Sequence, residues 1–490
     1  MAALLIYGEC NFRVRQSKSR IIKRGGATLD VKLGDGNDGE GTVRLAERLS
    51  SDLLRLGLLR EEKFGDRNLL CLEDQHLRLF LPMLSRFDIR LVPVKREGCP
   101  LAFCTGLLKA GGKVAVGGRS SNRTIPGGGQ GETDAIAAIG CVGELAERLS
   151  LWSLGNSDNR VFQKTAEQPE VDFAGLLGLS ETQSRNAVRE LGIKAKGEKN
   201  DKPDWQALSD RRVALRRLTD GQIEACPSFG VLFQDFEQAT GRRLSYASSV
   251  GCAVWQTLEG ARERAMLELV ERDAVAQAWY NRLGITFLNR SLLQEILDPA
   301  LLEYLDRQAR SFGVFAVETD LPVQVVMAIS HDGSGRIAAF GSSAGWEVAT
   351  AANGALREML QSENALTLMD RSYPATSEGK IPRQLTYARS KSIFEDLPLH
   401  QVPEAVGRQL ERGFSFHELL QSFFERDIEI WEFDATRQDL AIPCIKLLSP
   451  QLCGWEPRFG KKRLFEGVVE RGLRSSPASE AEFAARPFPF

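Results

Sequence analysis

The sequence predicts an α/β or α+β fold with mixed β-sheets, and three observations indicate this class. Strand-like apolar runs recur from residue 313 onward, as in GVFAVET, PVQVVMAI, RIAAFGSS, EIWEF and PCIKLL. Long helical patterns at 260–281 and 348–369 separate some of these runs. The composition is ordinary for a globular protein, with 43% hydrophobic and 26% charged residues, and 490 residues can bury a large core.

Before residue 313 each element is inferred locally. The opening MAALLIYGEC is expected as a strand rather than a secretion signal, because it has no basic n-region. Residues 43–56 repeat apolar side chains near helical spacing and predict a helix. A long amphipathic pattern that begins at Glu132 predicts another helix. The charged run KAKGEKNDKPD, residues 194–204, predicts an exposed linker.

The charges and cysteines argue against several classes of protein. There are 63 Lys and Arg against 65 Asp and Glu, so no basic field exists and we expect no nucleic-acid partner. A helix-turn-helix-like stretch at 179–193 does not change this, since such patterns are common on packed helices. No apolar run approaches the ~18–20 residues of a membrane span, so no membrane association is expected. The nine cysteines are scattered and never spaced CxxC, which favours a reducing cytoplasm.

The four histidines leave few options for catalysis. None of them pairs with a cysteine or another histidine at metal-ligand spacing, which argues against zinc. A nucleophilic triad has few possible bases, and no GxSxG accompanies them. If the protein is an enzyme, carboxylates are therefore expected to hold its chemistry.

Three predicted helical segments carry polar pairs at i, i+3 spacing, which places each pair on one helical face. The segments are IGCVGELAER (139–148), RAMLELVER (264–272) and GALREMLQSEN (354–364). The first two contain ExxER and the third contains ExxQ. The residues concerned are Glu144, Glu147 and Arg148, then Glu268, Glu271 and Arg272, then Glu358 and Gln361.

These segments are apolar on most sides, which predicts that their carboxylates are buried. A buried carboxylate is unfavourable unless it is paired or bound to a metal ion. Mg²⁺ is commonly shared between carboxylates and substrate phosphates, and arginines bind phosphates bidentately. The pattern therefore favours a site for Mg²⁺ and a nucleotide without a P-loop. Two alternatives stay open: a single ExxER is common on solvated helices, and Arg148 and Arg272 could be structural partners of the glutamates.

The stretch GGGQGE, residues 127–132, precedes the first of these segments. It is expected as a loop whose flexible backbone could approach phosphates. It lacks the GK[ST] of a Walker A loop and the third glycine of a dinucleotide fingerprint. A simple flexible turn is the alternative interpretation.

The three motifs resemble those of the YcaO family. GQGETDAIAAIGCVGELAERLS is similar to the first family motif, SSVGCAVWQTLEGARERAMLELVERDAVAQAWYNRL (248–283) to the second, and ANGALREMLQSE (352–363) to the third. The resemblance covers residues 125–490, and LELVERDAV…WYNRL is highly specific. It implies a YcaO-like ATP-binding catalytic domain over residues 111–490. Residues 1–110 are expected to dock a partner or a leader peptide.

The resemblance also implies roles for individual residues. The implied magnesium ligands are Glu144, Glu147, Glu268 and Glu271. The implied ATP contacts or supports are Arg148, Arg272, Glu358, Gln361, Gln130 and Ser249. The tail ARPFPF is similar to the proline-rich C-terminus of azoline-forming members, whose last residues reach the active site. The implied catalytic residues are Pro487, Pro489 and Phe490, with the terminal carboxylate as the candidate base.

The sequence departs from the family pattern at several positions. Gln130 stands where most members have Lys, Gly140 where most have Ser, and Gly260 where the second motif often has another metal-binding Glu. The form GETxxxI…GxxGExxER instead resembles the cyclodehydratase subunit of microcin-B-type thiazole/oxazole synthetases.

The reaction implied by this resemblance is an ATP- and Mg²⁺-dependent cyclodehydration of a ribosomally made precursor peptide in bacteriocin biosynthesis. A Cys, Ser or Thr side chain attacks the preceding backbone carbonyl, and phosphorylation of the amide oxygen allows a thiazoline or oxazoline to form. The expected partners are the precursor peptide, an E1-like leader-binding protein and an FMN-dependent dehydrogenase. The alternatives are YcaO-type thioamide or amidine formation, and a non-catalytic scaffold subunit.

Overall fold

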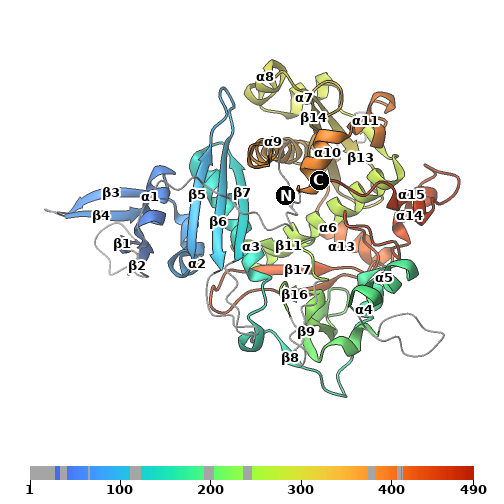
Figure 1. Ribbon diagram of the computed structural model, residues 1–490, viewed down its shortest axis with the longest axis horizontal. Helices are drawn as coiled ribbons and strands as arrows, with labels where there is room; N and C mark the ends of the chain where they lie inside the picture. Colours follow the sequence, from blue (N-terminus) through green and yellow to red (C-terminus); the bar gives the residue numbers. More distant parts are fainter. Residues whose placement is uncertain are drawn as a thin grey trace.

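The computed structural model describes residues 28–33, 41–64, 67–110, 123–191, 204–235, 246–373, 381–405, 410 and 412–490. The expected first strand at residues 1–10 lies outside these ranges, as does nearly all of the expected linker at 194–204. The described strands form four sheets, one of them mixed, with helices packed against them (Figure 1). The predicted α/β or α+β class is confirmed.

The first sheet, in the order β2-β1-β4-β3, lies at one end of the molecule (Figure 1). Its strands are β1 (Thr28–Lys32), β2 (Thr42–Ala46), β3 (Leu59–Phe64) and β4 (Arg67–Leu72), and only β1 and β4 run parallel. Helix α1 (Glu47–Arg55) follows β2 directly.

The prediction of one helix over residues 43–56 is therefore wrong in its first part. Val43 pairs with Val31 in the sheet, whereas Leu49 and Leu53 lie buried on α1. At this junction the apolar spacing changes from that of a strand to that of a helix. Leu45 fits both spacings, so the sequence pattern alone did not separate the two elements.

The second sheet is antiparallel, in the order β5-β6-β7. Its strands are β5 (Asp88–Val94), β6 (Ala102–Ala110) and β7 (Arg123–Gly131), and they are followed by α3 (Asp134–Ser150). The pairing of β6 with β7 joins residues on both sides of the expected boundary at residue 110. The expectation of a loop at 127–132 is wrong, since Gly127 and Gly129 pair with Gly106 and Cys104 in the sheet.

The third sheet combines the middle and the C-terminal part of the chain, in the order β10-β9-β16-β17-β11 with β8 beside β9. Its strands are β8 (Phe162–Gln163), β9 (Arg211–Arg217), β10 (Ile223–Pro227), β11 (Cys252–Val254), β16 (Trp431–Asp434) and β17 (Cys444–Leu448). The strand predictions for EIWEF and PCIKLL are thus confirmed. Their pairing with strands some 200 residues earlier in the chain is a feature of tertiary structure.

The fourth sheet is antiparallel, in the order β12-β13-β14-β15, and two long helices cover its faces. Its strands are β12 (Ile285–Phe287), β13 (Ser311–Val317), β14 (Gln324–His331) and β15 (Ala339–Gly345). The helices are α6 (Leu258–Asn281) and α9 (Val348–Ser372), which confirms the two long helical predictions.

Strand β14 shows why this sheet is apolar on both faces. Val325 and Met327 belong to the same core cluster as the buried residues of α6, and Val326 and Ala328 to the cluster of α9. Alternate side chains point to opposite faces of a strand, so a continuous apolar run is expected for a sheet buried on both sides.

The remaining α-helices surround these sheets. They are α2 (Leu81–Arg86), α4 (Phe173–Leu177), α5 (Glu181–Leu191), α7 (Arg290–Ile296), α8 (Pro299–Arg307), α10 (Arg383–Ser390), α11 (Ile393–Asp396), α13 (Phe416–Glu425), α14 (Arg463–Glu470) and α15 (Glu480–Ala484). Short 3₁₀-helices occur at Gln75–Phe80, Gly155–Ser157, Trp205–Leu208, Ser228–Gly230 and Leu399–Gln401.

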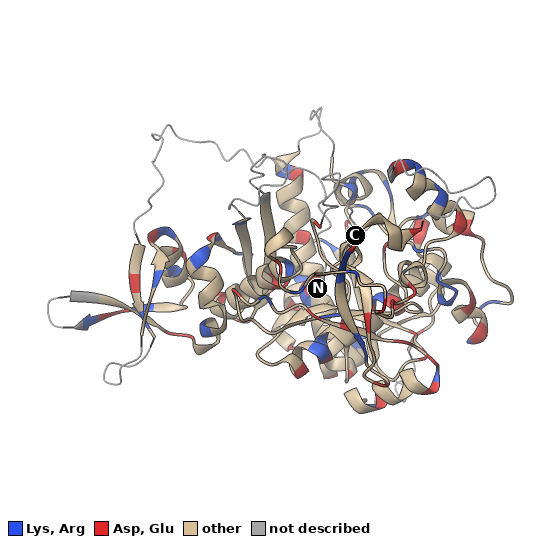
Figure 2. Ribbon diagram, turned by 90° about the horizontal axis from the view of Figure 1, so that it is seen from below, with Lys and Arg blue, Asp and Glu red and all other residues tan. Residues whose placement is uncertain are grey.

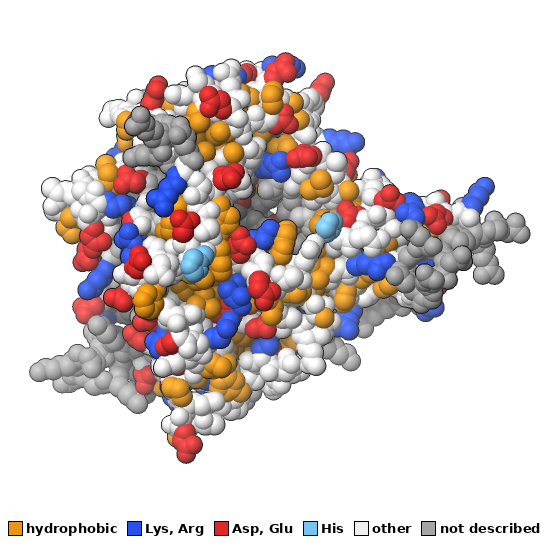
Figure 3. Space-filling view, turned by 180° about the vertical axis from the view of Figure 1, so that it is seen from behind, with side chains coloured by type: hydrophobic (Ala, Val, Ile, Leu, Met, Phe, Trp, Pro, Cys, Tyr) orange, Lys and Arg blue, Asp and Glu red, His pale blue; other side chains and the backbone are white. Residues whose placement is uncertain are grey.

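Charged residues of both signs are distributed along the whole molecule (Figure 2). On the face that Figure 3 shows, blue and red side chains alternate with orange ones rather than separating into patches of one sign. Within the described ranges, no helix combines the length and the apolar character needed to cross a bilayer.

Candidate functional site

Helices α3, α6 and α9 repeat one local geometry. Each begins after an extended N-cap residue, and the three N-caps are Thr133 (φ −132°), Thr257 (φ −131°) and Glu347 (φ −127°). Eleven residues after its N-cap, each helix carries a glutamate, and these glutamates are Glu144, Glu268 and Glu358. The three motifs found in the sequence are thus three copies of one strand-to-helix unit.

Each of these glutamates accepts a hydrogen bond from a backbone N–H of the segment before its helix. The donors and the Oε2 acceptors are Gly128 and Glu144 (2.5 Å), Gly251 and Glu268 (3.2 Å), and Ser342 and Glu358 (3.3 Å). Hydrogen bonds of this kind fix the orientation of the carboxylate. The glutamates could be predicted from the sequence, but this shared donor position could not, because it depends on how each strand lies on its helix.

One turn further along, the three helices carry Glu147, Glu271 and Gln361 at equivalent positions. In the first two copies an arginine follows and binds the first glutamate. Arg148 Nη2 lies 2.6 Å from Glu144 Oε1, and Arg272 Nη2 lies 3.0 Å from Glu268 Oε1. The third copy has Ser362 at this position, so the arginine is specific to the first two.

The first and third copies enclose a cavity of about 180 Å³. It is lined by Gly128, Gly129, Gln130, Gly140, Glu144, Glu358 and Gln361. Four of the residues predicted from the sequence to bind metal or nucleotide therefore meet at one cavity. The Oε1 atom of Gln361 is buried and has no hydrogen-bond partner among the described residues, so a polar group is available for a ligand.

The glycines of β7 bring this strand into direct contact with α3. A Cβ atom at Gly129 would lie 2.1 Å from the carbonyl oxygen of Ala137 and 2.3 Å from the backbone nitrogen of Cys141. A Cβ atom at Gly128 would lie 2.4 Å from Gln361 Nε2 on the other side. The glycines are thus needed for close approach of helices to a strand, and not for the flexible loop that the sequence suggested.

Glu147 connects the first copy electrostatically to the second. Burial raises the pKa of its carboxyl well above the usual range, and the nearby Cys252, Glu268 and Glu144 raise it further. Arg148 acts in the opposite direction. When several buried acidic side chains lie within interaction distance of each other, binding of a cation between them is favourable.

Ser342 connects the second copy to the third, and it was not among the residues predicted from the sequence. Its side chain is fully buried on β15, and its Oγ donates a hydrogen bond of 2.7 Å to Glu271 Oε1. Its backbone N–H is the donor to Glu358. The signal in the sequence is weak: a Ser-Ser pair within the strand AFGSSAG.

Lys446 on β17 is a second residue that the sequence analysis missed. Its ammonium group is buried and donates hydrogen bonds to the carbonyl oxygens of Ser248 (2.9 Å) and Val250 in the turn before β11. Burial lowers its pKa, while the nearby Glu268 and Glu147 act to raise it. A lysine inside the apolar run PCIKLL was the available signal, since lysine is seldom buried without a partner.

Arg272 lies between the glutamates of the second copy and an aromatic cluster. Its guanidinium carbon is 3.5 Å from the ring centroid of Trp455. The ring of Trp455 packs on Phe488 with centroids 4.5 Å apart, and Phe340 contacts both of these rings. The C-terminal tail is therefore two side-chain contacts away from Arg272.

The last residues of the tail are held by hydrogen bonds and ring contacts. Trp279 Nε1 donates to the carbonyl oxygen of Arg486, and the N–H of Phe488 donates to the Tyr280 hydroxyl. The Phe490 ring stacks on Phe340 with centroids 5.2 Å apart and an interplanar angle of 17°. The tail is thus packed against α6 and β15.

Not all of the predicted residues lie in the cavity. Pro487 is exposed and Pro489 is buried in the tail, and neither lines the cavity. Ser249 lies in the turn before β11, where its carbonyl oxygen accepts from the N–H of Cys252, and it does not line the cavity either.

The donor atoms fit Mg²⁺ by their chemistry, although they are not yet arranged as ligands. In the described part of the chain, no three His, Cys, Asp or Glu side chains form a group that could hold a metal ion as they stand. The carboxylates of Glu144 and Glu268 face arginines instead. Buried carboxylate oxygens together with the unpartnered oxygen of Gln361 are nevertheless the hard donors that Mg²⁺ prefers.

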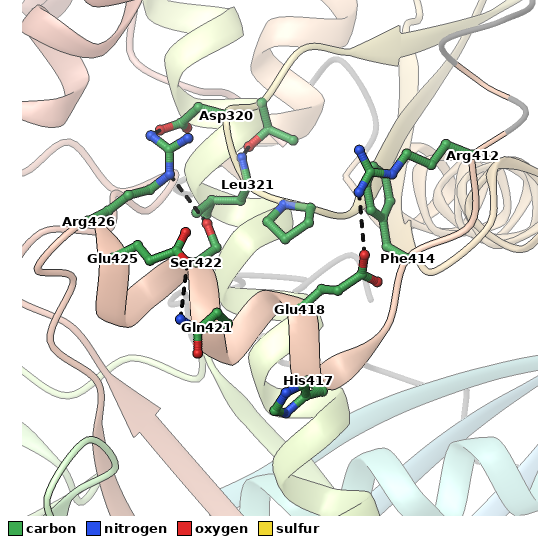
Figure 4. Close-up of a pocket in the computed structure, with 12 residues that line it drawn as sticks. Asp320, Leu321, Arg412, Phe414, His417, Glu418, Gln421, Ser422, Glu425 and Arg426 are labelled. Carbon is green, nitrogen blue, oxygen red and sulfur yellow. Dashed lines mark hydrogen bonds and ion pairs between the residues drawn. The ribbon is translucent and has the colours of Figure 1, made fainter.

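A second cavity, of about 600 Å³, lies elsewhere on the molecule (Figure 4). It is formed by the connection between β13 and β14, the segment 412–414 and one face of α13. Ion pairs between Arg426 and Asp320 and between Arg412 and Glu418 lie across it (Figure 4). None of the glutamates of the three copies lines it.

Comparisons with known proteins agree with this arrangement. The family model of the YcaO cyclodehydratases, described as ATP- and Mg²⁺-binding, matches residues 128–453. No curated protein matches the chain by sequence. Among solved structures, a heterocyclase in complex with substrate and cofactor has a TM-score of 0.68 at 19% identity, covering 92% of this chain and 63% of the other.

Two further structures share the fold. The heterocyclase TruD has a TM-score of 0.54 at 21% identity, covering 74% of this chain and 52% of the other. YcaO from Methanopyrus kandleri bound with AMPPCP and Mg²⁺ has a TM-score of 0.50 at 15% identity, covering 80% and 90%. The chain thus spans less than two thirds of the length of the two heterocyclases.

Proposed function

This chain belongs to the YcaO cyclodehydratase family, and on that premise we propose that it is an ATP-dependent peptide cyclodehydratase. ATP and Mg²⁺ are the cofactors by which this family is described. The observation that carries the proposal is the set of three strand-to-helix copies. The first and third strand-to-helix copies place the buried carboxylates of Glu144 and Glu358 and the amide of Gln361 around one cavity. The second copy is linked to the third by the hydrogen bond from Ser342 to Glu271, and all three copies lie within the region that matches the family.

In this proposal Glu144, Glu147, Glu268 and Glu271 hold Mg²⁺. Bound Mg²⁺ and ATP supply a phosphoryl group for the amide oxygen and offset the charge that develops on it. The residues proposed to bind or support ATP are Arg148, Arg272, Glu358, Gln361, Gln130 and Ser249. Four of the ten residues named here line the cavity, and five others form ion pairs or interact electrostatically with other residues of this set.

The proposed reaction converts a peptide amide and a neighbouring side chain into a ring with loss of one water. The Cys, Ser or Thr side chain forms a bond to the preceding carbonyl carbon, and the amide oxygen leaves as phosphate. A base must take protons from the nucleophile and from the amide nitrogen. We propose the Phe490 carboxylate for this role, with Pro487 and Pro489 shaping the tail, because the packed tail ends beside β15.

The substrate and partners are part of the same proposal. The substrate is a ribosomally made precursor peptide of a bacteriocin or related natural product, and the product rings are thiazolines or oxazolines. Residues 1–110 dock an E1-like leader-binding protein or the leader itself, and an FMN-dependent dehydrogenase oxidises the rings. We propose that the protein works in the cytoplasm, which is supported by the eight cysteines of the described residues, all of which are free thiols.

The experiment is an ATP-dependent mass measurement on a co-encoded peptide rich in Cys, Ser, Thr and Gly. The purified complex is assayed as wild type, as Glu147→Gln, as Glu271→Gln and without Phe490. Glu303→Gln is the matched control, because Glu303 is exposed and pairs with Arg307 on α8. We expect loss of one water mass per ring in the wild type and the control, and no loss in either buried-glutamate variant.

Each other outcome has a definite meaning. A mass gain from exchange of oxygen for sulfur would replace cyclodehydration by thioamide formation. ATP binding without any mass change would contradict the proposed nucleophile, and absence of ATP binding would leave a scaffold subunit. Unchanged activity without Phe490 would remove its carboxylate from the mechanism.

A further inference from the structure

Ser342 differs from the residues at the equivalent position in the other two strand-to-helix copies. In the first two copies the residue that donates its N–H to the glutamate is a glycine, Gly128 or Gly251. In the third copy it is Ser342, so only here does the donor residue also carry a polar side chain. That hydroxyl does not serve its own helix. It reaches across to Glu271 on α6, in the second copy.

The backbone at this point is held firmly against α9. A Cβ atom at Gly341 would lie 2.2 Å from the carbonyl oxygen of Ala355 and 2.2 Å from the nitrogen of Met359. Strand and helix therefore touch without an intervening side chain. Since Ser342 follows directly, its N–H and its hydroxyl start from a backbone that has little freedom to shift.

The two hydrogen bonds of Ser342 act on carboxylates of different helices. Glu271 and Glu358 are each only 4% exposed, and Ser342 is fully buried between them. A hydroxyl that donates to a buried carboxylate restricts its rotamers and fixes its orientation. Arg272 Nε lies 3.8 Å from the same Oε1 atom of Glu271, so this oxygen interacts with both the serine hydroxyl and the arginine charge.

We propose that Ser342 is a positioning residue of the nucleotide and metal site, whose hydroxyl holds the Glu271 carboxylate in place relative to Glu358. This inference rests on the proposed function, since it assigns Ser342 to the same site. The hydrogen bond from Ser342 to Glu271 joins the second and third copies directly, without a metal ion or a nucleotide between them.

The test is calorimetric binding of a non-hydrolysable ATP analogue to the full chain as a function of Mg²⁺. Ser342→Ala removes only the hydroxyl and is expected to weaken binding about tenfold. Ser342→Thr keeps a hydroxyl and is expected to restore most of the affinity. Ser343→Ala is the matched control, because Ser343 faces Gly354 of α9 and its Oγ bonds to the carbonyl oxygen of Ala344.

Thermal unfolding of each variant establishes that it is folded. Ser342→Cys is a second test variant, for the case that threonine is too large for the site. Cysteine is close to serine in size but donates weakly, so its affinity should lie between those of the wild type and Ser342→Ala. Equal binding by the wild type and Ser342→Ala would overturn the inference. So would equal losses in the alanine, cysteine and threonine variants while all stay folded. A wild type that binds no nucleotide would refute the proposed function instead.

Discussion

At the scale of single residues, Gly128 and Gly140 line the same cavity but leave different space for a side chain. A Cβ atom at Gly128 would lie 2.4 Å from Gln361 Nε2, whereas the nearest atom to one at Gly140 is the Cα of Gly129 at 3.7 Å. The first position therefore controls where Gln361 points. The second position has room for a small side chain.

We predict that Gly128→Ala weakens nucleotide binding, because the added methyl group displaces the Gln361 side chain. The fold should survive, since the displaced group is the end of a flexible side chain. Gly140→Ala should bind normally and gain up to about 1 kcal/mol of stability from better helix propensity. Calorimetric titration with an ATP analogue and denaturant unfolding test both statements. Normal binding by Gly128→Ala would contradict the role given to Gln361.

At the scale of elements, the contact between β15 and α9 decides the geometry of the third copy. This contact depends on Gly341, where a Cβ atom would meet backbone atoms of α9 and not a movable side chain. The helix would have to move away from the strand to accommodate any larger residue. Such a movement would separate Glu358 from the Ser342 N–H.

We predict that Gly341→Ala lowers the free energy of unfolding by about 1–3 kcal/mol, as overpacking of a close contact does. Gly143→Ala on α3 is the control, since the nearest atom to its Cβ would be in the Phe80 ring at 3.9 Å. That change should be neutral or slightly stabilising. Urea denaturation of the two variants is the measurement, and equal midpoints would show that α9 adjusts without strain.

At the scale of the whole molecule, an ion-pair network ties remote parts of the chain together. Arg463 on α14 binds Asp273 on α6 (2.8 Å) and Asp320 in the β13–β14 connection. Arg426, which follows α13, binds the same Asp320 at 3.0 Å. Three segments that are far apart in the sequence are thereby fixed around the C-terminal part of α6.

This network predicts a pH dependence of stability. Burial alone would raise the pKa of Asp320, but the hydrogen bonds and charge of Arg463, together with Arg426, outweigh burial and lower it. The unfolded chain then binds the proton more tightly than the folded one. The stabilisation is therefore complete above the unfolded pKa of about 3.9 and is lost as the pH falls through the lower folded value.

We predict that Asp320→Asn is less stable than the wild type at pH 7 by about 1–3 kcal/mol. The difference should shrink as the pH falls from about 5 to below 3. Asp306→Asn is the control, because Asp306 pairs with Arg290 at the surface, where an ion pair contributes little. Denaturant midpoints across this pH range measure the effect. A difference in the free energy of unfolding that stays constant at all pH values would contradict the lowered pKa of Asp320.

The fold class, the long helices α6 and α9 and the later strands could be predicted from the sequence, because their apolar periodicity is long and regular. The same holds for the three motifs and their glutamates, since i, i+3 spacing on a helix is a local property. Prediction failed at residues 43–56, where Leu45 satisfies two periodicities, and at 127–131, where glycines that permit close packing resemble those of a flexible loop.

The contacts between these elements could not be predicted from the sequence, because they arise in the folded chain. Gly128 and Gly251 donate to glutamates 16 and 17 residues later, and Ser342 reaches Glu271 from a strand that is 71 residues away in the chain. Lys446 reaches the turn before β11 only because β17 pairs with β11. These contacts depend on strand pairing and on glycine-mediated packing between distant segments. Periodicity within one segment carries no information about them, which is why the glutamates could be predicted and the groups that position them could not.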